Sequence, residues 1–377
     1  MGGRGGFRLP RRWREALAAR RAKARAAREP QPRARRLLLH VGGPKCGSSA
    51  IQVALTANSA SLAARGVLLA SDRMDAEEDM IYGQVGYFDA LSGRPDGAEE
   101  LARRFRDLAV AMDERSAATL VISAENLLLR PAVAGMLIPA ARAAGFVPEI
   151  VAYVRRWDDF LIAAWQQWGI KSHASPEAYW KDHGFPGWLA ALRAWEDQAG
   201  LAAMAVFPFR RDIFPEGDVT AHFLEVTGLS FPGMVRPTPV NPSTSEHLSD
   251  LMNRARDLFT DQDDNAVLGT LSELIGPAAY KSGSGSYFLS LDQRRALLEQ
   301  VEAEDEALKA RYVPQLGSAP LFPPVRPEQV AECSDIDKLR AENALLLRAV
   351  HSLGQRLSAL ETRTAKAAPW RRWRLRL

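Results

Sequence analysis

The chain has little cysteine and no long apolar run, and these two absences exclude several classes of protein. Its 377 residues contain two cysteines, Cys46 and Cys333, which form no metal-ligand or redox spacing. A disulfide framework is therefore not expected, and this cysteine usage favours a reducing compartment. No segment reaches the roughly 20 apolar residues of a membrane-spanning helix, and the N-terminus lacks the apolar stretch of a secretory signal. We therefore predict a cytoplasmic protein, peripheral at most to the inner face of a membrane.

The net charge of +4 comes from the two ends of the chain and not from its middle. Residues 1–36 carry thirteen Lys or Arg against two Glu, and residues 367–377 combine tryptophan with arginine. Positive tails are attracted to anionic surfaces, and tryptophan beside cations favours the lipid interface. We expect the tails to bind an anionic membrane surface, the alternative being solvated arms. The sequence contains no recognisable nucleic-acid-binding module, so nucleic acid is not an expected partner.

Short apolar runs alternate with helical patterns through the first 209 residues. Such runs are typical of buried parallel strands, and we predict five of them, at 35–41, 67–70, 118–123, 148–154 and 202–209. Helices are predicted at 48–64, 99–114, 133–145 and 158–169, with a loop over 71–97. The alternation predicts an α/β fold, a parallel sheet flanked by helices in a P-loop-like three-layer arrangement, with a C-terminal coiled-coil helix.

Five parts are predicted along the chain. They are a basic N-terminal arm (1–36), the α/β domain (37–313), a Pro-rich linker (314–334), a coiled-coil helix (335–366) and a basic aromatic tail (367–377). In the helix, residues three and four apart form an unbroken heptad series: Ile336, Leu339, Asn343, Leu346, Val350, Leu353, Leu357 and Leu360. The series predicts a homodimer through residues 335–365, in which Asn343 favours a parallel two-stranded pairing. The alternative is a single helix docked on its own domain.

A glycine-rich segment connects the first predicted strand with the first helix. It reads His40-Val41-Gly42-Gly43-Pro44-Lys45-Cys46-Gly47-Ser48-Ser49. Loops of this kind point backbone N–H groups at a phosphate, and the helix N-terminus adds positive potential. An ATP-type loop carries its lysine directly after the last glycine, whereas here Ser48 stands there and Lys45 lies inside the loop. A kinase or nucleotide hydrolase using ATP and magnesium is therefore the alternative and not the first hypothesis.

Pro44-Lys45-Cys46-Gly47-Ser48-Ser49 resembles the 5'-phosphosulfate loop of the sulfotransferases. The resemblance extends from about Arg36 to Val313 and is to bacterial carbohydrate sulfotransferases, which use 3'-phosphoadenosine 5'-phosphosulfate as donor. A second family element is an Arg with a Ser eight residues later and an aromatic two beyond. Arg155 and Trp165 match it, and Ala163 replaces the Ser. We expect Arg156 or a loop at 281–286 to bind the 3'-phosphate in place of that Ser.

The resemblance implies a role for each matching residue. The donor would be held by Gly43, Pro44, Lys45, Cys46, Gly47, Ser48, Ser49 and Arg155, the last at the 3'-phosphate. Lys45 would also be catalytic, its charge following the bridging oxygen as the S–O bond breaks. No metal is expected. The acceptor would be a hydroxyl or amine of a carbohydrate or glycolipid.

The general base is chosen by position. Glu125 follows a buried strand, at the edge where open α/β sheets bind their ligands, and its structural alternative is an acid at a helix N-terminus. His173 and His183 are rivals for the base. Six tryptophans between residues 157 and 195 are predicted mainly to pack a core, with a sugar-binding groove as the alternative. A further alternative for the whole chain is a non-catalytic coiled-coil scaffold.

Overall fold

The computed structural model describes residues 15, 35–76, 84–185, 187–237, 243–280 and 285–367, without the side chains of 365–367. Its contacts cluster in two compact units. The first comprises Met1–Phe160, Phe185–Asn241 and Leu297–Pro324, and the second Leu161–Gly184, Pro242–Ala296 and Val325–Leu377. The expected domain limits stay predictions. Most of the basic arm and nearly all of the basic aromatic tail lie outside the described residues.

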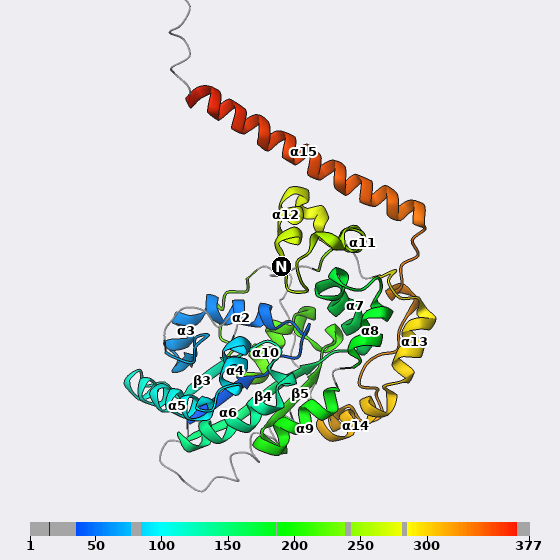
Figure 1. Cartoon of the computed structure of the whole chain (residues 1–377). Coiled ribbons are helices and arrows are strands. Elements are labelled where there is room, and N and C mark those ends of the chain that lie inside the picture. The colour runs from blue at the N-terminus through cyan, green and yellow to red at the C-terminus, as the bar shows by residue number, and fades with distance from the viewer. Residues whose placement is uncertain are drawn as a thin grey trace, which may run out of the picture. The chain divides into compact units, whose positions relative to one another are not determined.

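The first unit contains a five-stranded parallel sheet (Figure 1). Its strands are β1 (Arg35–His40), β2 (Val67–Leu69), β3 (Thr119–Ser123), β4 (Phe146–Val154) and β5 (Met204–Pro208). The order is β2-β3-β1-β4-β5, and each neighbouring pair is parallel. Leu37, Leu38 and Leu39 of the central strand are fully buried, as expected where helices cover both faces of a sheet. The predicted α/β three-layer fold is confirmed.

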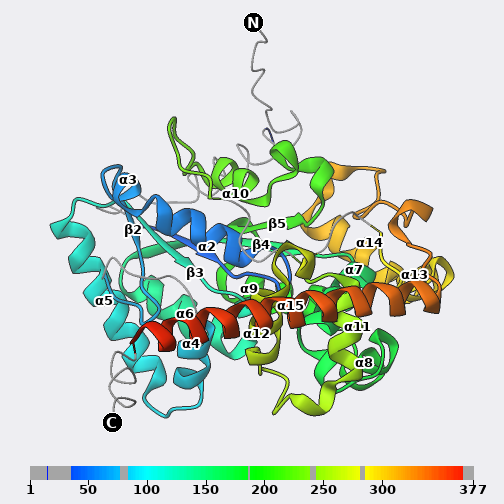
Figure 2. The ribbon, with the colours of Figure 1, turned by 90° about the horizontal axis from the view of Figure 1, so that it is seen from above.

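Helices cover the two faces of this sheet unequally. They are α2 (Ser48–Ala57), α3 (Ser59–Ala63), α4 (Gln84–Ser92), α5 (Gly97–Glu114), α6 (Pro131–Ala143), α9 (Trp188–Ala199), α10 (Val219–Thr227) and α14 (Glu302–Tyr312). Figure 2 shows α2 beside α10 on one face, whereas α5, α6 and α9 pack together on the other. The chain therefore leaves β1 toward one face but leaves β3 and β4 toward the opposite face. Ligands of open α/β sheets bind at such a switch point, outside the carboxyl ends of the strands.

Two predictions of local structure were wrong. The helix expected over 48–64 breaks at Asn58, whose side-chain amide donates to the carbonyls of Ala54 and Val235 at 2.7 and 2.9 Å. The segment expected to be a loop over 71–97 contains α4, which Phe88 and Leu91 anchor by burying their side chains. These two apolar positions were too few to stand out in a polar, glycine-containing stretch.

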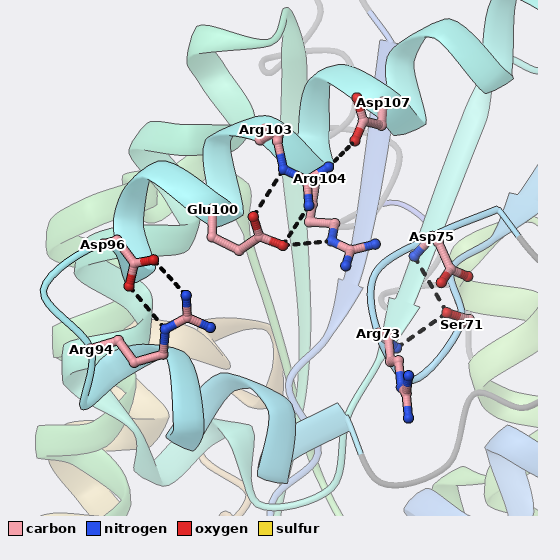
Figure 3. A network of polar contacts seen from close by, with 9 residues as sticks. All are labelled: Ser71, Arg73, Asp75, Arg94, Asp96, Glu100, Arg103, Arg104 and Asp107. Atoms are coloured by element: carbon pink, nitrogen blue, oxygen red, sulfur yellow. Dashed lines mark hydrogen bonds and ion pairs between the residues drawn. The ribbon is translucent and has the colours of Figure 1, made fainter.

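The start of α5 carries a group of ion pairs whose side chains are exposed or half-buried (Figure 3). Glu100 accepts from Arg103 and Arg104 at 2.7 and 2.9 Å, and Arg103 also pairs with Asp107 at 2.8 Å. Pairs of this kind on a solvated helix each contribute little to stability. The turn at Ser71 in the same figure is closed by local hydrogen bonds. The network thus helps to define local structure and supplies no site chemistry.

The second unit is helical. It contains α8 (Pro176–His183), α11 (Glu246–Arg254), α12 (Ala266–Ile275) and α15 (Asp335–Ala367), while α7 (Trp157–Gln167) and α13 (Leu291–Glu299) each have residues in both units. Its core contains Trp165, Ile170, Leu248, Met252 and Leu345. The predicted helix over 335–366 is confirmed as α15, and its pairing with a second chain stays a prediction. Within the described residues, no helix is long and apolar enough to cross a membrane.

Candidate functional site

The loop after β1 is wedged between the ends of β3 and β4. A Cβ on Gly42, whose φ is +40°, would lie 2.5 Å from the Ala124 carbonyl oxygen. A Cβ on Gly43 would lie 2.3 Å from the Tyr153 carbonyl oxygen. Both contacts are too short for any side chain, so the loop needs glycine at both positions. The Val41 carbonyl accepts from the Leu128 amide at 2.6 Å, which ties the loop to the segment after β3.

The N-terminus of α2 has unused hydrogen-bond donors. Gly47 occupies the N-cap position at φ 82° without a side-chain cap, and the first turn contains no acidic residue. The amides of Gly47, Ser48 and Ser49 donate to no carbonyl in the described part of the chain. The buried Ser48 Oγ also has no hydrogen-bond partner there. Buried polar atoms are rarely left unsatisfied, and these donors at a helix N-terminus suit a phosphate or sulfate group.

Arg155, directly after β4, is joined to this loop. Its Nη1 donates to the carbonyl oxygen of Lys45 at 2.7 Å, and its guanidinium lies 5.5 Å from the centroid of the Phe209 ring. Its own carbonyl accepts from Trp188 Nε1 at 3.1 Å. Lys45 has φ 60°, an uncommon conformation for a residue with a side chain. The loop and Arg155 therefore form one connected structure.

The charges of the site come from the ends of three neighbouring strands. Burial lowers the pKa of Lys45 below its ordinary value, the charge of Glu125 opposes this shift, and the charge of Arg155 adds to it. Glu125 follows β3 and is half-buried. The structure thus brings together Lys45, Glu125 and Arg155, three residues that the sequence predicted for the site. Two cations beside one carboxylate can bind an anion and accept a proton.

Cys46, also in the loop, has its side chain packed in the interior of the protein. Its side chain is fully buried, and its Sγ lies 3.5 Å from the Pro44 carbonyl oxygen that accepts from it. Burial raises the pKa of the Cys46 thiol to about 12. Because the thiolate is the reactive form, Cys46 is suited to packing the loop and not to acting as a nucleophile.

Sequence reasoning missed two features beneath and beside the loop. Asn126 has φ 62°, and its buried Oδ1 has no partner in the described part of the chain. The sequence did contain a signal for this turn, an Asn directly after a predicted strand, because Asn adopts positive φ more readily than most residues. The second feature is a buried contact of 2.8 Å between His40 Nδ1 and Ser123 Oγ. Burial lowers the pKa of His40 to about 3, so the ring is neutral and links the ends of β1 and β3.

Arg156 does not fit the expected role of binding the 3'-phosphate in place of the family's Ser. Its Nε and Nη2 donate to the buried Asp158 carboxylate at 2.6 and 2.9 Å, and its Nη1 donates to the Pro323 carbonyl at 3.0 Å. These contacts commit the guanidinium to the interior of its own unit. The other suggested replacement is the loop at 281–286. Residues 281–284 of this loop lie outside the described residues.

Several other candidates belong to the second unit. Ala163 and Trp165 lie on α7, and the buried Trp165 donates from Nε1 to the His173 carbonyl at 3.1 Å. His173 Nε2 pairs with Asp182 at 2.8 Å, and His183 stacks on Tyr179. These contacts explain Trp165 and both histidines as parts of the helical unit. Glu125 is the proposed base that lies with the loop in the first unit.

Most of the clustered tryptophans pack the interior, as predicted. Trp157, Trp165, Trp188 and Trp195 are buried. Trp157 stacks on Trp188 with ring centroids 5.2 Å apart, and Trp195 Nε1 donates to the Leu128 carbonyl at 3.1 Å. These four indoles are therefore not exposed surfaces for a sugar.

Comparison with known proteins gives little further information. No family model matches the chain. Among curated proteins, an uncharacterized protein of Archaeoglobus fulgidus is similar to it, with 30% identity over 171 residues. The match covers 44% of this chain and 46% of that protein, so the chain spans about half the length of the relative. Because that relative is uncharacterized, the similarity indicates no activity for this chain, and a function has to be argued from the site itself.

Proposed function

We propose that the chain is a sulfotransferase that takes its sulfonate from 3'-phosphoadenosine 5'-phosphosulfate. The acceptor is a hydroxyl or amine of a carbohydrate or glycolipid. The proposal depends on the loop of residues 42–49 at the switch point of the sheet, together with the resemblance of that loop to the sulfotransferases. The cytoplasmic location at the inner face of a membrane is part of the proposal and depends on the basic tails.

The observation that carries the proposal is the buried Ser48 Oγ at an uncapped helix N-terminus, which has no hydrogen-bond partner among the described residues. A buried hydroxyl without a partner costs free energy that a bound anion would recover. The neighbouring amides and the absence of acidic residues in the first turn of α2 favour the same kind of ligand. The 5'-phosphate of the donor supplies the oxygens that these groups lack.

The reaction needs one cation at the leaving oxygen. Lys45 donates an N–H to the oxygen that bridges phosphorus and sulfur, and stabilises its charge when the S–O bond breaks with its electron pair. The desolvation that lowers the pKa of Lys45 also strengthens this interaction, because opposite charges attract more strongly away from water. The lysine thus acts in the transition state, where the oxygen carries more charge than in the ground state.

Glu125 is the proposed base. As the acceptor oxygen or nitrogen forms its bond to sulfur, the Glu125 carboxylate takes up the acceptor proton. Its carboxylate influences Lys45 electrostatically, which is consistent with both side chains serving one reaction centre. Arg155 is the proposed ligand of the 3'-phosphate, since a guanidinium can hold the loop carbonyl through one nitrogen and a phosphate through the others.

Calorimetric binding of 3'-phosphoadenosine 5'-phosphate without metal is the direct test. We expect wild-type binding, and about 10- to 100-fold weaker binding by Lys45→Ala, Arg155→Ala and Ser48→Ala, the range for losing a hydrogen bond to a charged group. Ser61→Ala is the matched control, because Ser61 is an exposed serine on α3. Its affinity should equal that of the wild type.

Competition with ATP and magnesium separates the two enzyme hypotheses. Magnesium-dependent ATP binding, without binding of the bisphosphate, would overturn the sulfotransferase and support the kinase or hydrolase. If neither nucleotide binds, the loop belongs to a scaffold. If the bisphosphate binds equally to the wild type and to Ser48→Ala, the ligand lies elsewhere and the argument from Ser48 fails.

A further inference from the structure

We propose that α15 pairs with α15 of a second copy of this chain, as a parallel, in-register two-stranded coiled coil. The proposal is independent of the proposed catalytic function. It depends on a long helix that docks on its own unit by one face and leaves a second, regular apolar face without a partner in the described structure. That second face, called the seam below, consists of Ile336, Leu339, Asn343, Leu346, Val350, Leu353, Leu357 and Leu360.

The docked face of α15 is short and distinct from the seam. Glu342, Leu345 and Ala349 are each no more than 6% exposed, and α15 contacts α11 and α12 of the same unit. Arg356 adds an ion pair to Glu273 at 2.8 Å. Both interpretations of the heptad helix therefore apply, to different faces: α15 docks on its own unit, and docking leaves its heptad series uncovered.

The apolar side chains of the seam are exposed on the single chain. All seven are between 42% and 65% exposed, from Leu346 to Val350. Isolated exposed apolar residues are ordinary, but a contiguous stripe on a soluble protein marks an interaction surface. The stripe follows a 3.5-residue repeat over more than three heptads, which is the period of a helix that packs on another helix.

The residue types along the seam select the partner and its direction. Of the four a positions, two are β-branched (Ile336 and Val350), one is Asn343 and one is Leu357, and all four d positions are leucine. β-Branched residues at a with leucine at d favour two parallel strands. In that register the two copies of Asn343 face each other and can exchange hydrogen bonds. An antiparallel heptad register sets each a position against a d position, so Asn343 would be buried against leucine without a partner.

Charges beside the seam agree with the parallel register. At the flanking positions, Asp335 of one copy would face Arg340 of the other. Arg356, which also pairs with Glu273 of its own chain, would face Glu361 of the other copy. Both pairs join opposite charges, at the first and last parts of the helix. The middle of the helix carries Leu347 and Gly354 at the corresponding positions, so no like charges meet across the seam.

Light scattering of the full chain at micromolar concentration tests the pairing. We expect a mass of two chains for the wild type and of one chain for Val350→Asp/Leu353→Asp, with unchanged circular dichroism because both side chains are exposed. Gln355→Asp/Ser358→Asp is the matched control, since it adds the same charge to exposed positions of α15 outside the seam. It should retain the mass of two chains.

Crosslinking tests the direction. In Cys333→Ser/Leu360→Cys, mild oxidation should join two chains by a disulfide, because a parallel pair sets residue 360 beside its own copy. In an antiparallel pair spanning residues 336–360, the two thiols would be roughly 36 Å apart. A one-chain mass for the wild type would overturn the proposal, as would a three-chain mass. If the control Gln355→Asp/Ser358→Asp also had the mass of one chain, the seam would not be the interface. A mass of two chains without crosslinking of residue 360 would refute the parallel direction.

Discussion

The guanidinium of Arg155 donates from Nη1 to the carbonyl oxygen of Lys45 at 2.7 Å. This bond joins the residue after β4 to the loop after β1, although the two residues are 110 positions apart in the sequence. The other guanidinium nitrogens of Arg155 donate to no group in the described part of the chain. One side chain can therefore fix the loop and still contact a ligand.

The substitution Arg155→Lys should show whether ligand binding needs only the positive charge of Arg155 or also the planar geometry of its guanidinium. An ammonium keeps the charge but lacks the planar fork that can donate in two directions. We expect binding of 3'-phosphoadenosine 5'-phosphate to weaken about tenfold, or about 1.4 kcal/mol, as measured by calorimetry. Arg142→Lys is the control, because Arg142 also donates to backbone carbonyls but lies on α6. Equal affinities for Arg155→Lys and wild type would show that charge alone suffices.

Binding of the bisphosphate should weaken at alkaline pH. The lowered pKa of Lys45 means that its ammonium loses its proton earlier than an exposed lysine does as the pH rises. Deprotonation removes a cation from the site, so affinity falls as the pH passes the lowered pKa. Lys45→Arg should bind with a flatter profile, because a guanidinium stays charged. Calorimetric titrations between about pH 7 and about pH 10 cover the range below the ordinary lysine pKa, and identical profiles would contradict the assignment.

Gly43→Ala should damage both the fold and the site. The added Cβ would meet the Tyr153 carbonyl oxygen at 2.3 Å, a backbone atom that cannot move without shifting β4. We expect a loss of about 1–3 kcal/mol in the free energy of unfolding, the usual cost of overpacking, measured by urea denaturation. Gly135→Ala is the matched control, since nothing lies within 4 Å of its Cβ on α6. Helix propensity predicts a gain of about 0.5–1 kcal/mol there.

Asp305 should make the protein less stable as the pH rises from about 4 to about 7. Burial raises the pKa of Asp305 to about 7, with Glu304 and Glu306 adding to the shift and Arg156 opposing it. Over this range the folded state holds a proton that the unfolded chain releases, so unfolding is favoured as the pH increases. Asp305→Asn should therefore be more stable than the wild type at pH 8, by roughly 1–3 kcal/mol.

Thermal unfolding at several pH values measures this effect. The gain from Asp305→Asn should shrink as the pH falls and approach zero below about pH 3, where Asp305 is protonated in both the folded and the unfolded state. Asp292→Asn serves as control, because the Asp292 side chain is 94% exposed, and its stability should follow the wild type. A gain of the same size at every pH would mean that the substitution acts through packing and not through ionisation.

The sequence predicted the sheet and the loop well, because both depend on local patterns. Each strand is a short apolar run. The glycines at positions 42 and 43 are required by close contacts with the backbone of neighbouring strands, and Gly47 is favoured by its φ of +82°. The break at Asn58 could not be predicted, since it depends on a hydrogen bond to Val235, 177 residues away. Arg156 illustrates the same limit: its partner Asp158 is near in sequence, but Pro323 is 167 residues distant.

Because Cys46 is buried, chemical labelling of its thiol can measure movement of the loop. A fully buried thiol whose pKa is about 12 reacts with alkylating reagents only when the loop moves away from the sheet. In a Cys333→Ser background, the rate of labelling at Cys46 therefore reports how often the loop opens. Any ligand that holds the loop closed slows this labelling, so a rate measured without turnover can screen donors before an acceptor is known.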